Sequence, residues 1–314
     1  MLTKSNKQLT EETPAKPVGE TTPDEPVVSP AASRPVRVPQ EAPDKPLTID
    51  GKGLDLDRTD MVSVSKPSFG IALGYLAGIA AAELVVALIN PLVGIVLHIL
   101  LLLGLVSHAS LTAGHPQHKL YLALALAPLI RVLSLSLPLA NLPEIYWYAI
   151  IGVPLVIAVF VVKRRLGYTR QDVGLTVGNL PLQLLVGATG IPFGIVEFYI
   201  LRPQGLADSL TWGSLALPAL ILLVATGFAE EICFRGVMQR SADEALGRWG
   251  WVYIAVLFAL LHTGYLLVSN VIFVLLVGLF FGWVVRWTRS LLGVTLSHGL
   301  INIMLYLVAP LLLS

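Results

Sequence analysis

A succession of long apolar segments constrains this chain more than any other feature of its sequence. From Ser68 onward, apolar runs of roughly 18 to 24 residues alternate with short polar breaks. An α-helix rises 1.5 Å per residue, so a run of this length can cross the ~30 Å hydrocarbon layer of a membrane. Nine candidate spans follow from the pattern: residues 68–89, 92–109, 119–140, 145–162, 181–201, 212–236, 250–268, 270–287 and 291–312.

The composition indicates the same class. The 314 residues are 55% hydrophobic and 13% charged, whereas soluble domains are roughly 45–50% apolar and about 25% charged. A net charge of +1 argues against a nucleic-acid partner. We therefore predict an all-α fold, a polytopic transmembrane helix bundle of eight or nine spans whose partner is the lipid bilayer. The count depends on the short breaks Asn90-Pro91 and Ser269-Asn270, either of which could be a kink or a re-entrant turn.

The first 66 residues have a different character. They hold nine prolines, nine Lys or Arg and eleven Asp or Glu. Such a segment buries too little apolar surface to offset the entropy lost on ordering. The sequence thus predicts a disordered, Pro-rich tail over residues 1–66 and a transmembrane domain over residues 67–314.

The basic residues allow a prediction of orientation, because Lys and Arg concentrate in short cytoplasmic connections. Every second break is basic, whereas the breaks between them hold only Arg202. This alternation predicts a multi-pass protein of the cell membrane with its N-terminal tail in the cytoplasm. The basic residues of the inward-facing breaks are Lys119, Lys163, Arg164, Arg165, Arg170, Arg235, Arg240, Arg248, Arg286 and Arg289.

Two adjacent acids, Glu230 and Glu231, end the apolar run from Leu215 to Phe228. Carboxylates are costly in such a position and require a reason. Successive helical residues point about 100° apart, so the two acids are expected to have different roles. Glu231 precedes Arg235 by four residues, the favourable order for a helical ion pair, which leaves Glu230 free to face the bundle interior. The structural alternative is that both acids simply lie at the cytoplasmic interface.

Two later pairs of side chains share a helix face: Phe258 with His262, and His298 with Asn302. A lone intramembrane histidine can serve as a hydrogen-bond partner between helices. Two polar groups stacked on one face are harder to explain in that way. Counting 1.5 Å per residue from the predicted cytoplasmic ends places Glu230, His262, His298 and Asn302 roughly 10–18 Å deep, in one layer.

Such a layer could carry hydrolysis. A carboxylate beside an imidazole can polarise a water, while a second imidazole and a carboxamide N–H can donate hydrogen bonds to a developing oxyanion. A metal alternative stays open, because Glu230, His262 and His298 could form a zinc site with a position left for water. The helical zinc signature His-Glu-x-x-His is absent, so no cofactor is favoured, although zinc is retained as the alternative.

The motifs resemble those of the CPBP family, the CAAX proteases and bacteriocin-processing enzymes that are also called the Abi family. The family pattern is Glu-Glu-x-x-x-Arg, then Phe-x-x-x-His, then His-x-x-x-Asn on later helices. This chain matches each position, and the resemblance extends over about residues 166–312, the predicted protease core. The matching residues are Glu230, Glu231, Arg235, Phe258, His262, His298 and Asn302.

The resemblance implies an intramembrane endopeptidase that acts on membrane-associated or small peptide substrates. It implies that Glu230 activates water with help from His262, and that His298 and Asn302 form the oxyanion hole. Members were long labelled metalloproteases, and the metal-independent glutamate protease is the version favoured here. Two alternatives are kept: a zinc-dependent form of the same protease, and a non-catalytic bacteriocin-immunity or scaffold protein.

Other intramembrane polar residues receive structural interpretations. Glu83 and Arg131 are expected at similar depth, which predicts a charge pair that braces the bundle. An alternative role for Arg131 is to bind a substrate carboxylate. Glu197 and His98 are assigned no role. Cys233 is the only cysteine, so an intramolecular disulfide is excluded. It has no evident base on its own helix face, so we do not expect it to be a nucleophile.

Overall fold

The computed structural model describes residues 66–115, 117–137 and 141–313. Over these ranges the chain forms helices and no strand. Eight helical segments are long and apolar enough to cross a membrane. The predicted all-α polytopic bundle is therefore confirmed. The predicted tail lies outside the described residues apart from Lys66, so its boundary stays a prediction.

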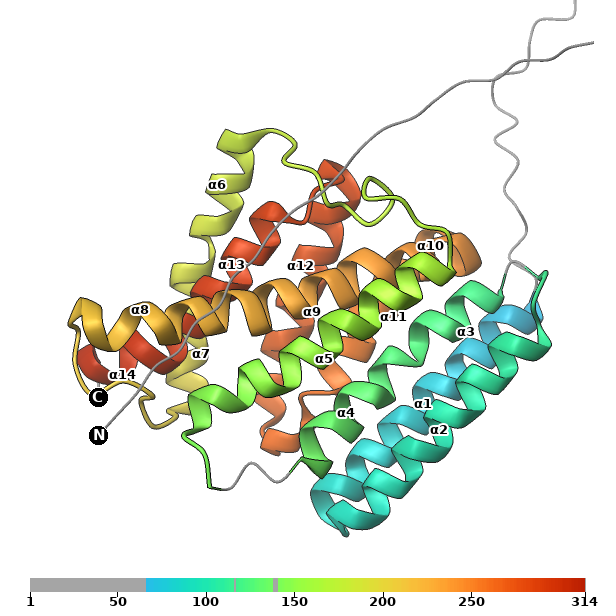
Figure 1. Cartoon of the computed structure of the whole chain (residues 1–314), viewed down its shortest axis with the longest axis horizontal. Helices are drawn as coiled ribbons and strands as arrows, with labels where there is room; N and C mark the ends of the chain where they lie inside the picture. Colours follow the sequence, from blue (N-terminus) through green and yellow to red (C-terminus); the bar gives the residue numbers. More distant parts are fainter. Residues whose placement is uncertain (1–65, 116, 138–140, 314) are drawn as a thin grey trace, which may run out of the picture. The chain divides into compact units, whose positions relative to one another are not determined.

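The first part of the bundle is a series of adjacent antiparallel spans, the third of which is formed by α3 and α4 end to end (Figure 1). The Asn90 side chain accepts hydrogen bonds from the backbone N–H groups of Leu92 (2.8 Å) and Val93 (3.3 Å), which caps the second helix. Because the first two helices pack against each other, Asn90-Pro91 is a connection and not a kink. These helices are α1 (Lys66–Leu88), α2 (Pro91–Leu111), α3 (His118–Leu124), α4 (Leu126–Ser136) and α5 (Glu144–Arg165).

Helices α6 (Leu180–Ala188) and α7 (Gly190–Leu201) form one candidate span, and glycines set how closely it packs. A Cβ atom at Gly190 would lie 2.2 Å from the carbonyl oxygen of Ser297, and one at Gly194 would lie 2.7 Å from that of Ile301. Small residues four apart let two helix backbones approach closely in a membrane. As a result, α7 lies directly against α13, defined below.

A largely helical segment, residues 212–265, contains the predicted span 212–236 and most of the predicted span 250–268. This explains why eight candidates are found where nine were counted. The chain reverses at Gly247, whose φ is +59°, and α11 then returns along α10 (Figure 1). The segment comprises α8 (Trp212–Ile221), the π-helix η1 (Leu222–Phe228), α9 (Ala229–Glu231), the π-helix η2 (Ile232–Met238), α10 (Gln239–Leu246), the 3₁₀-helix η3 (Gly247–Trp249), α11 (Gly250–Leu260) and the 3₁₀-helix η4 (Thr263–Tyr265).

The last part of the chain forms two further spans. The break predicted at Ser269-Asn270 lies inside the first turn of α12, and the true connection precedes it, around Leu266 with φ +53°. Helix α11 packs against α12, so the chain reverses direction here, as two separate spans require. The elements are α12 (Val268–Thr288), α13 (Leu292–Ile303), the π-helix η5 (Met304–Val308) and α14 (Ala309–Leu312).

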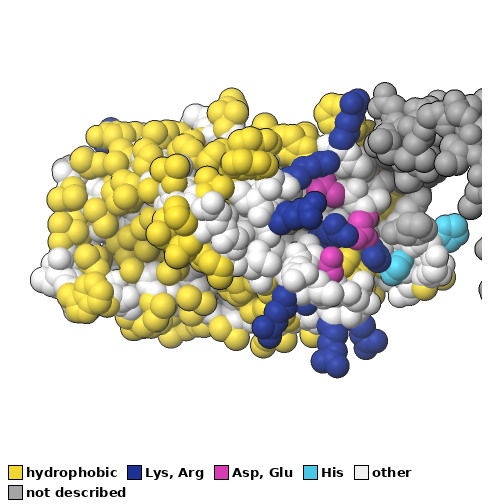
Figure 2. Space-filling model, turned by 90° about the horizontal axis from the view of Figure 1, so that it is seen from above, with side chains coloured by type: hydrophobic (Ala, Val, Ile, Leu, Met, Phe, Trp, Pro, Cys, Tyr) yellow, Lys and Arg dark blue, Asp and Glu magenta, His cyan; other side chains and the backbone are white. Residues whose placement is uncertain are grey.

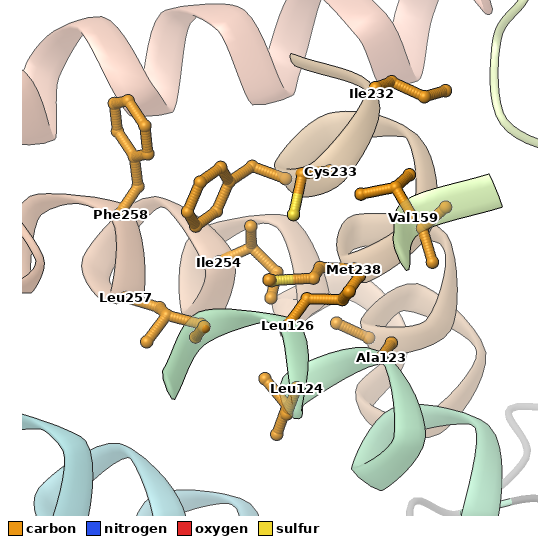
Figure 3. Close-up of a cluster of buried hydrophobic side chains, with 14 of the residues drawn as sticks. Ala123, Leu124, Leu126, Val159, Ile232, Cys233, Met238, Ile254, Leu257 and Phe258 are labelled. Atoms are coloured by element: carbon orange, nitrogen blue, oxygen red, sulfur yellow. The ribbon is translucent and has the colours of Figure 1, made fainter. Parts of the chain in front are cut away.

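A cluster of buried apolar side chains holds η2 in place (Figure 3). Ile232, Cys233 and Met238 of η2 are fully buried. Cys233 and Met238 lie among side chains from α3, α4, α5 and α11, whereas Ile232 points to the other side of η2 (Figure 3). Glu230 and Glu231, which directly precede η2, are thus held in place by a tightly packed helix. The facing residues labelled in Figure 3 are Ala123, Leu124, Leu126, Val159, Ile254, Leu257 and Phe258.

Charged side chains gather toward one end of the bundle, away from a broad apolar surface (Figure 2). Lys119 Nζ lies 3.0 Å from Glu244 Oε2, and the Thr176 hydroxyl donates to the carbonyl of Arg289 over 2.8 Å. Loops that the sequence placed on one side of the membrane therefore meet at one end. We call this the basic end; it is formed by Lys119, Lys163, Arg240, Arg248, Arg286 and Arg289.

Candidate active site

The four predicted site residues come from three parts of the bundle. Glu230 lies on α9, between the two π-helices, and His298 and Asn302 lie one turn apart on α13. His262 was expected within a helical span over residues 250–268. Helix α11 ends at Leu260 instead, and His262 lies in the turn that follows, with φ −99° and ψ 5°.

His298 lies between the two acids. Its Nδ1 atom is 2.7 Å from Glu231 Oε1, and its Nε2 atom is 3.9 Å from Glu230 Oε2. Glu231 Oε1 also accepts a hydrogen bond from Arg235 Nη1 over 2.9 Å, so the predicted ion pair is confirmed. Glu231 is 0% exposed and Arg235 3% exposed. An ionised carboxylate can only accept, so Nδ1 of His298 carries a proton.

Phe258 connects the arginine to the second histidine. The guanidinium carbon of Arg235 lies 4.1 Å from the centroid of the Phe258 ring, which in turn lies 4.7 Å from that of the His262 ring. A desolvated cation–π contact contributes about 2 kcal/mol. His262 Nδ1 lies 2.8 Å from the carbonyl oxygen of Phe258 and must donate to it. In neutral His262, Nε2 is therefore left as an acceptor.

Asn302 is oriented by a residue that the sequence reasoning did not single out. Its Nδ2 atom donates to Thr226 Oγ1 over 2.8 Å, and the Thr226 hydroxyl in turn donates to the carbonyl of Leu222. The available signal was a polar side chain one turn before Glu230 in an otherwise apolar run. Close packing makes the contact, since a Cβ at Gly227 would lie 2.9 Å from the backbone nitrogen of Gly299.

Two cavities share the His262 side chain. The larger, of about 300 Å³, is lined by Glu230, Thr226 and His262 and by residues outside the predicted motifs. The smaller, of about 40 Å³, has a polar lining of Glu197, His262, His298 and Asn302. The four predicted residues are thus brought together around these cavities. The additional polar residues of the larger cavity include Arg131, Ser134, Tyr148 and Tyr265.

Arg131 also forms the predicted intramembrane pair with Glu83. Its Nε atom donates to Glu83 Oε1 over 2.5 Å, and its Nη2 atom donates to Oε2. His98 joins the pair, with Nε2 3.2 Å from Glu83 Oε1. Glu83 and His98 are both 0% exposed. The pair joins α1 and α4 beside the larger cavity, with His98 of α2 next to it, which confirms the predicted charge pair.

The zinc alternative requires three side chains whose donor atoms can bind one metal ion. Within residues 66–115, 117–137 and 141–313, no group of three or more His, Cys, Asp and Glu side chains is arranged to hold a metal ion. Nδ1 of His262 and of His298 is engaged, by Phe258 and by Glu231, so Nε2 of each ring is the atom left to bind a ligand. The zinc alternative stays a prediction, and no step through a metal is derived.

The fold and the site together define a multi-pass membrane protein with a Glu, His and Asn arrangement around two internal cavities. Residues 212–304 match the family model for type II CAAX prenyl endopeptidase Rce1-like proteins. The match covers all seven motif residues and confirms the resemblance to CPBP proteases over this part of the chain. No curated protein and no solved structure matches the chain. The matched family is one of proteases. The activity of this chain and the roles of its individual residues stay predictions.

Proposed function

We propose that the chain is an integral-membrane endopeptidase that hydrolyses peptide bonds with water activated by Glu230. The observation that carries this proposal is the position of His298, which is held by Glu231 on one ring nitrogen and turned toward Glu230 with the other. Glu230 keeps 28% of its side chain accessible because it lines the larger cavity, where a substrate could reach it.

In the proposed reaction, water binds between Glu230 and the acceptor Nε2 of His262. The water oxygen bonds to the carbonyl carbon of the scissile peptide while Glu230 takes its proton. The same proton then passes to the leaving nitrogen as the C–N bond breaks, giving a carboxyl group and an amine. This scheme needs no further reactant.

The developing oxyanion needs hydrogen-bond donors, and two are at hand. Asn302 uses one N–H on Thr226 and has a second available. The Nδ1 proton of His298 is engaged by Glu231, so His298 can donate from Nε2 only as an imidazolium. Carboxylates at 2.7 and 3.9 Å supply the counter-charges for that state. One such donor is typically worth about 10²–10³ in kcat.

The substrate we propose is a membrane-associated or small peptide that enters the larger cavity. We further propose that the basic end faces the cytoplasm, because Lys and Arg concentrate in short cytoplasmic loops. The cut would then be made near the cytoplasmic face of the cell membrane.

The test is cleavage of a peptide library, including prenylated C-terminal peptides, by purified full-length protein. Glu230→Ala should lose turnover, whereas Glu244→Gln, which changes an acid at the basic end, should keep it. Equal turnover by Glu230→Ala and wild type would exclude this mechanism. A wild-type protein that is folded but cleaves nothing would favour the scaffold alternative.

A further inference from the structure

A third carboxylate faces the candidate site from outside the motifs. Glu197 on α7 is 8% exposed, and its side chain lines the smaller cavity. In the described part of the chain it makes no hydrogen bond and no ion pair. It also lies outside the matched region, residues 212–304. A buried carboxylate without a protein partner is costly in a membrane protein, so its retention needs a reason.

The packing of α7 fixes where Glu197 points. Gly190 and Gly194 bring the backbone of α7 against α13. Glu197 follows Gly194 by three residues, so it continues the same helix face. That face meets α13 at Ile301, the neighbour of Asn302. Glu197 is therefore directed at the polar face of α13 by backbone contacts.

The smaller cavity has the size and lining of a water site. Its volume is about 40 Å³, and one water needs about 10–15 Å³ of such space, so about three waters fit. Glu197, His262, His298 and Asn302 supply the polar contacts that a buried water requires. The rest of the wall is apolar and is formed by Phe258, Phe273, Val274, Val277, Phe281 and Ile301.

We propose that Glu197 is a positioning residue that holds water in this compartment and supplies it at His262, where the compartment meets the larger cavity. The inference rests on the proposed function. Each peptide bond hydrolysed consumes one water, and the hydrocarbon layer holds none in reserve. The Glu197 carboxylate, which has no protein donor, is satisfied by water hydrogen bonds, and the α12 side chains close the compartment on the other side.

The kinetic test compares Glu197→Leu, which removes the polar group, with Glu197→Gln, which keeps a hydrogen-bonding side chain of the same size. The Leu variant should lower kcat by about 10- to 100-fold without changing KM, and the Gln variant should recover most of the loss. The Tm of neither variant should be lower than that of the wild-type protein. Tyr199 of α7 is 53% exposed, so Tyr199→Leu is the matched control and should turn over substrate at the wild-type rate.

Wild-type kcat in Glu197→Leu would overturn the proposal, as would a Gln variant as slow as the Leu variant at full thermal stability. A second measurement does not depend on activity or on the variants folding. An experimental structure of the wild-type protein in lipid nanodiscs, at a resolution that shows waters, should place ordered water between Glu197 and Asn302 or His298. A dry compartment would overturn the inference. Ordered water in a protein that cleaves nothing would support the water site while the proposed protease activity failed.

Discussion

The Nδ1 atom of His298 lies 2.7 Å from Oε1 of Glu231, a carboxylate that also binds Arg235 and is closed to solvent. This contact assigns unlike tasks to two adjacent acids. Glu231 accepts the Nδ1 proton and fixes the orientation of the His298 ring, as a carboxylate behind a histidine does in metal sites and catalytic triads. Glu230 then meets the opposite ring nitrogen from the cavity side.

The first prediction concerns Glu231. Glu231→Gln removes the charge that holds both His298 and Arg235, so kcat should fall by about 10- to 100-fold. Removing one partner of a buried ion pair should also lower the free energy of unfolding by about 3–5 kcal/mol. Activity assays and thermal unfolding in detergent measure the two effects. The double variant with Arg235→Met should be more stable than Glu231→Gln alone yet remain inactive; full activity in Glu231→Gln would contradict this role.

A second prediction tests the close packing of η1 on α13. Gly227→Ala would place a methyl group 2.9 Å from the backbone of Gly299 and Thr295, so the helices must separate. Such overpacking typically costs about 1–3 kcal/mol. We also expect a lower kcat, because separating the helices would break the hydrogen bond from Asn302 to Thr226. Gly213→Ala, where an added Cβ meets nothing within 4 Å, is the control and should be at least as stable as wild type.

The Glu83–Arg131 pair gives a third prediction. Arg131→Leu leaves Glu83 buried without its bidentate donor, so the variant should lose about 3–5 kcal/mol of stability. Glu83→Gln combined with Arg131→Leu should recover part of that loss, which a double-mutant cycle in thermal unfolding would measure. If Arg131→Leu is as abundant and heat-stable as wild type, the pair does not brace the bundle.

A fourth prediction separates the glutamate from the zinc mechanism. We expect turnover to survive incubation with a metal chelator, because the proposed steps use only Glu230, two imidazoles and a carboxamide. The assay is peptide cleavage by the purified protein before and after chelation, with zinc added back. Loss of cleavage on chelation, with recovery on zinc addition, would decide for the zinc-dependent form.

The fifth prediction is the orientation. Cys233 is the only cysteine and is fully buried, so single cysteines can be introduced without a native background. In intact cells, a membrane-impermeant thiol reagent should label Asp208→Cys, at the loop between α7 and α8. It should reach Arg170→Cys, in the loop after α5, only after permeabilisation. The reverse pattern would place the basic end outside the cell.

Much of this arrangement could be predicted from local spacing. Apolar run lengths gave the spans, and the four-residue separation of Glu231 and Arg235 gave their ion pair. What could not be predicted depends on tertiary contacts. His262 lies in a turn because α11 ends early, a detail that helical periodicity misses. Thr226 and Glu197 became relevant only because glycines let η1 and α7 approach α13, and no single-helix pattern indicates which helices meet.

The two π-helices on either side of α9 have a consequence for how this site tolerates change. A π turn holds one residue more than an α turn. The π-helices η1 and η2 therefore change the direction in which the side chains of α9 point relative to those of α8 and α10. Glu230 and Glu231 can thus point toward α13 while the apolar faces of α8 and α10 stay directed at their own neighbours. Deleting one residue from either π turn would let that turn close as an α turn, so the flanks would keep their orientations. The same deletion in α8 or α10, which are α-helical, would rotate one flank by about 100° relative to the acids. The π turns are thus the places where this long helix can lose a residue without turning its acids away from α13.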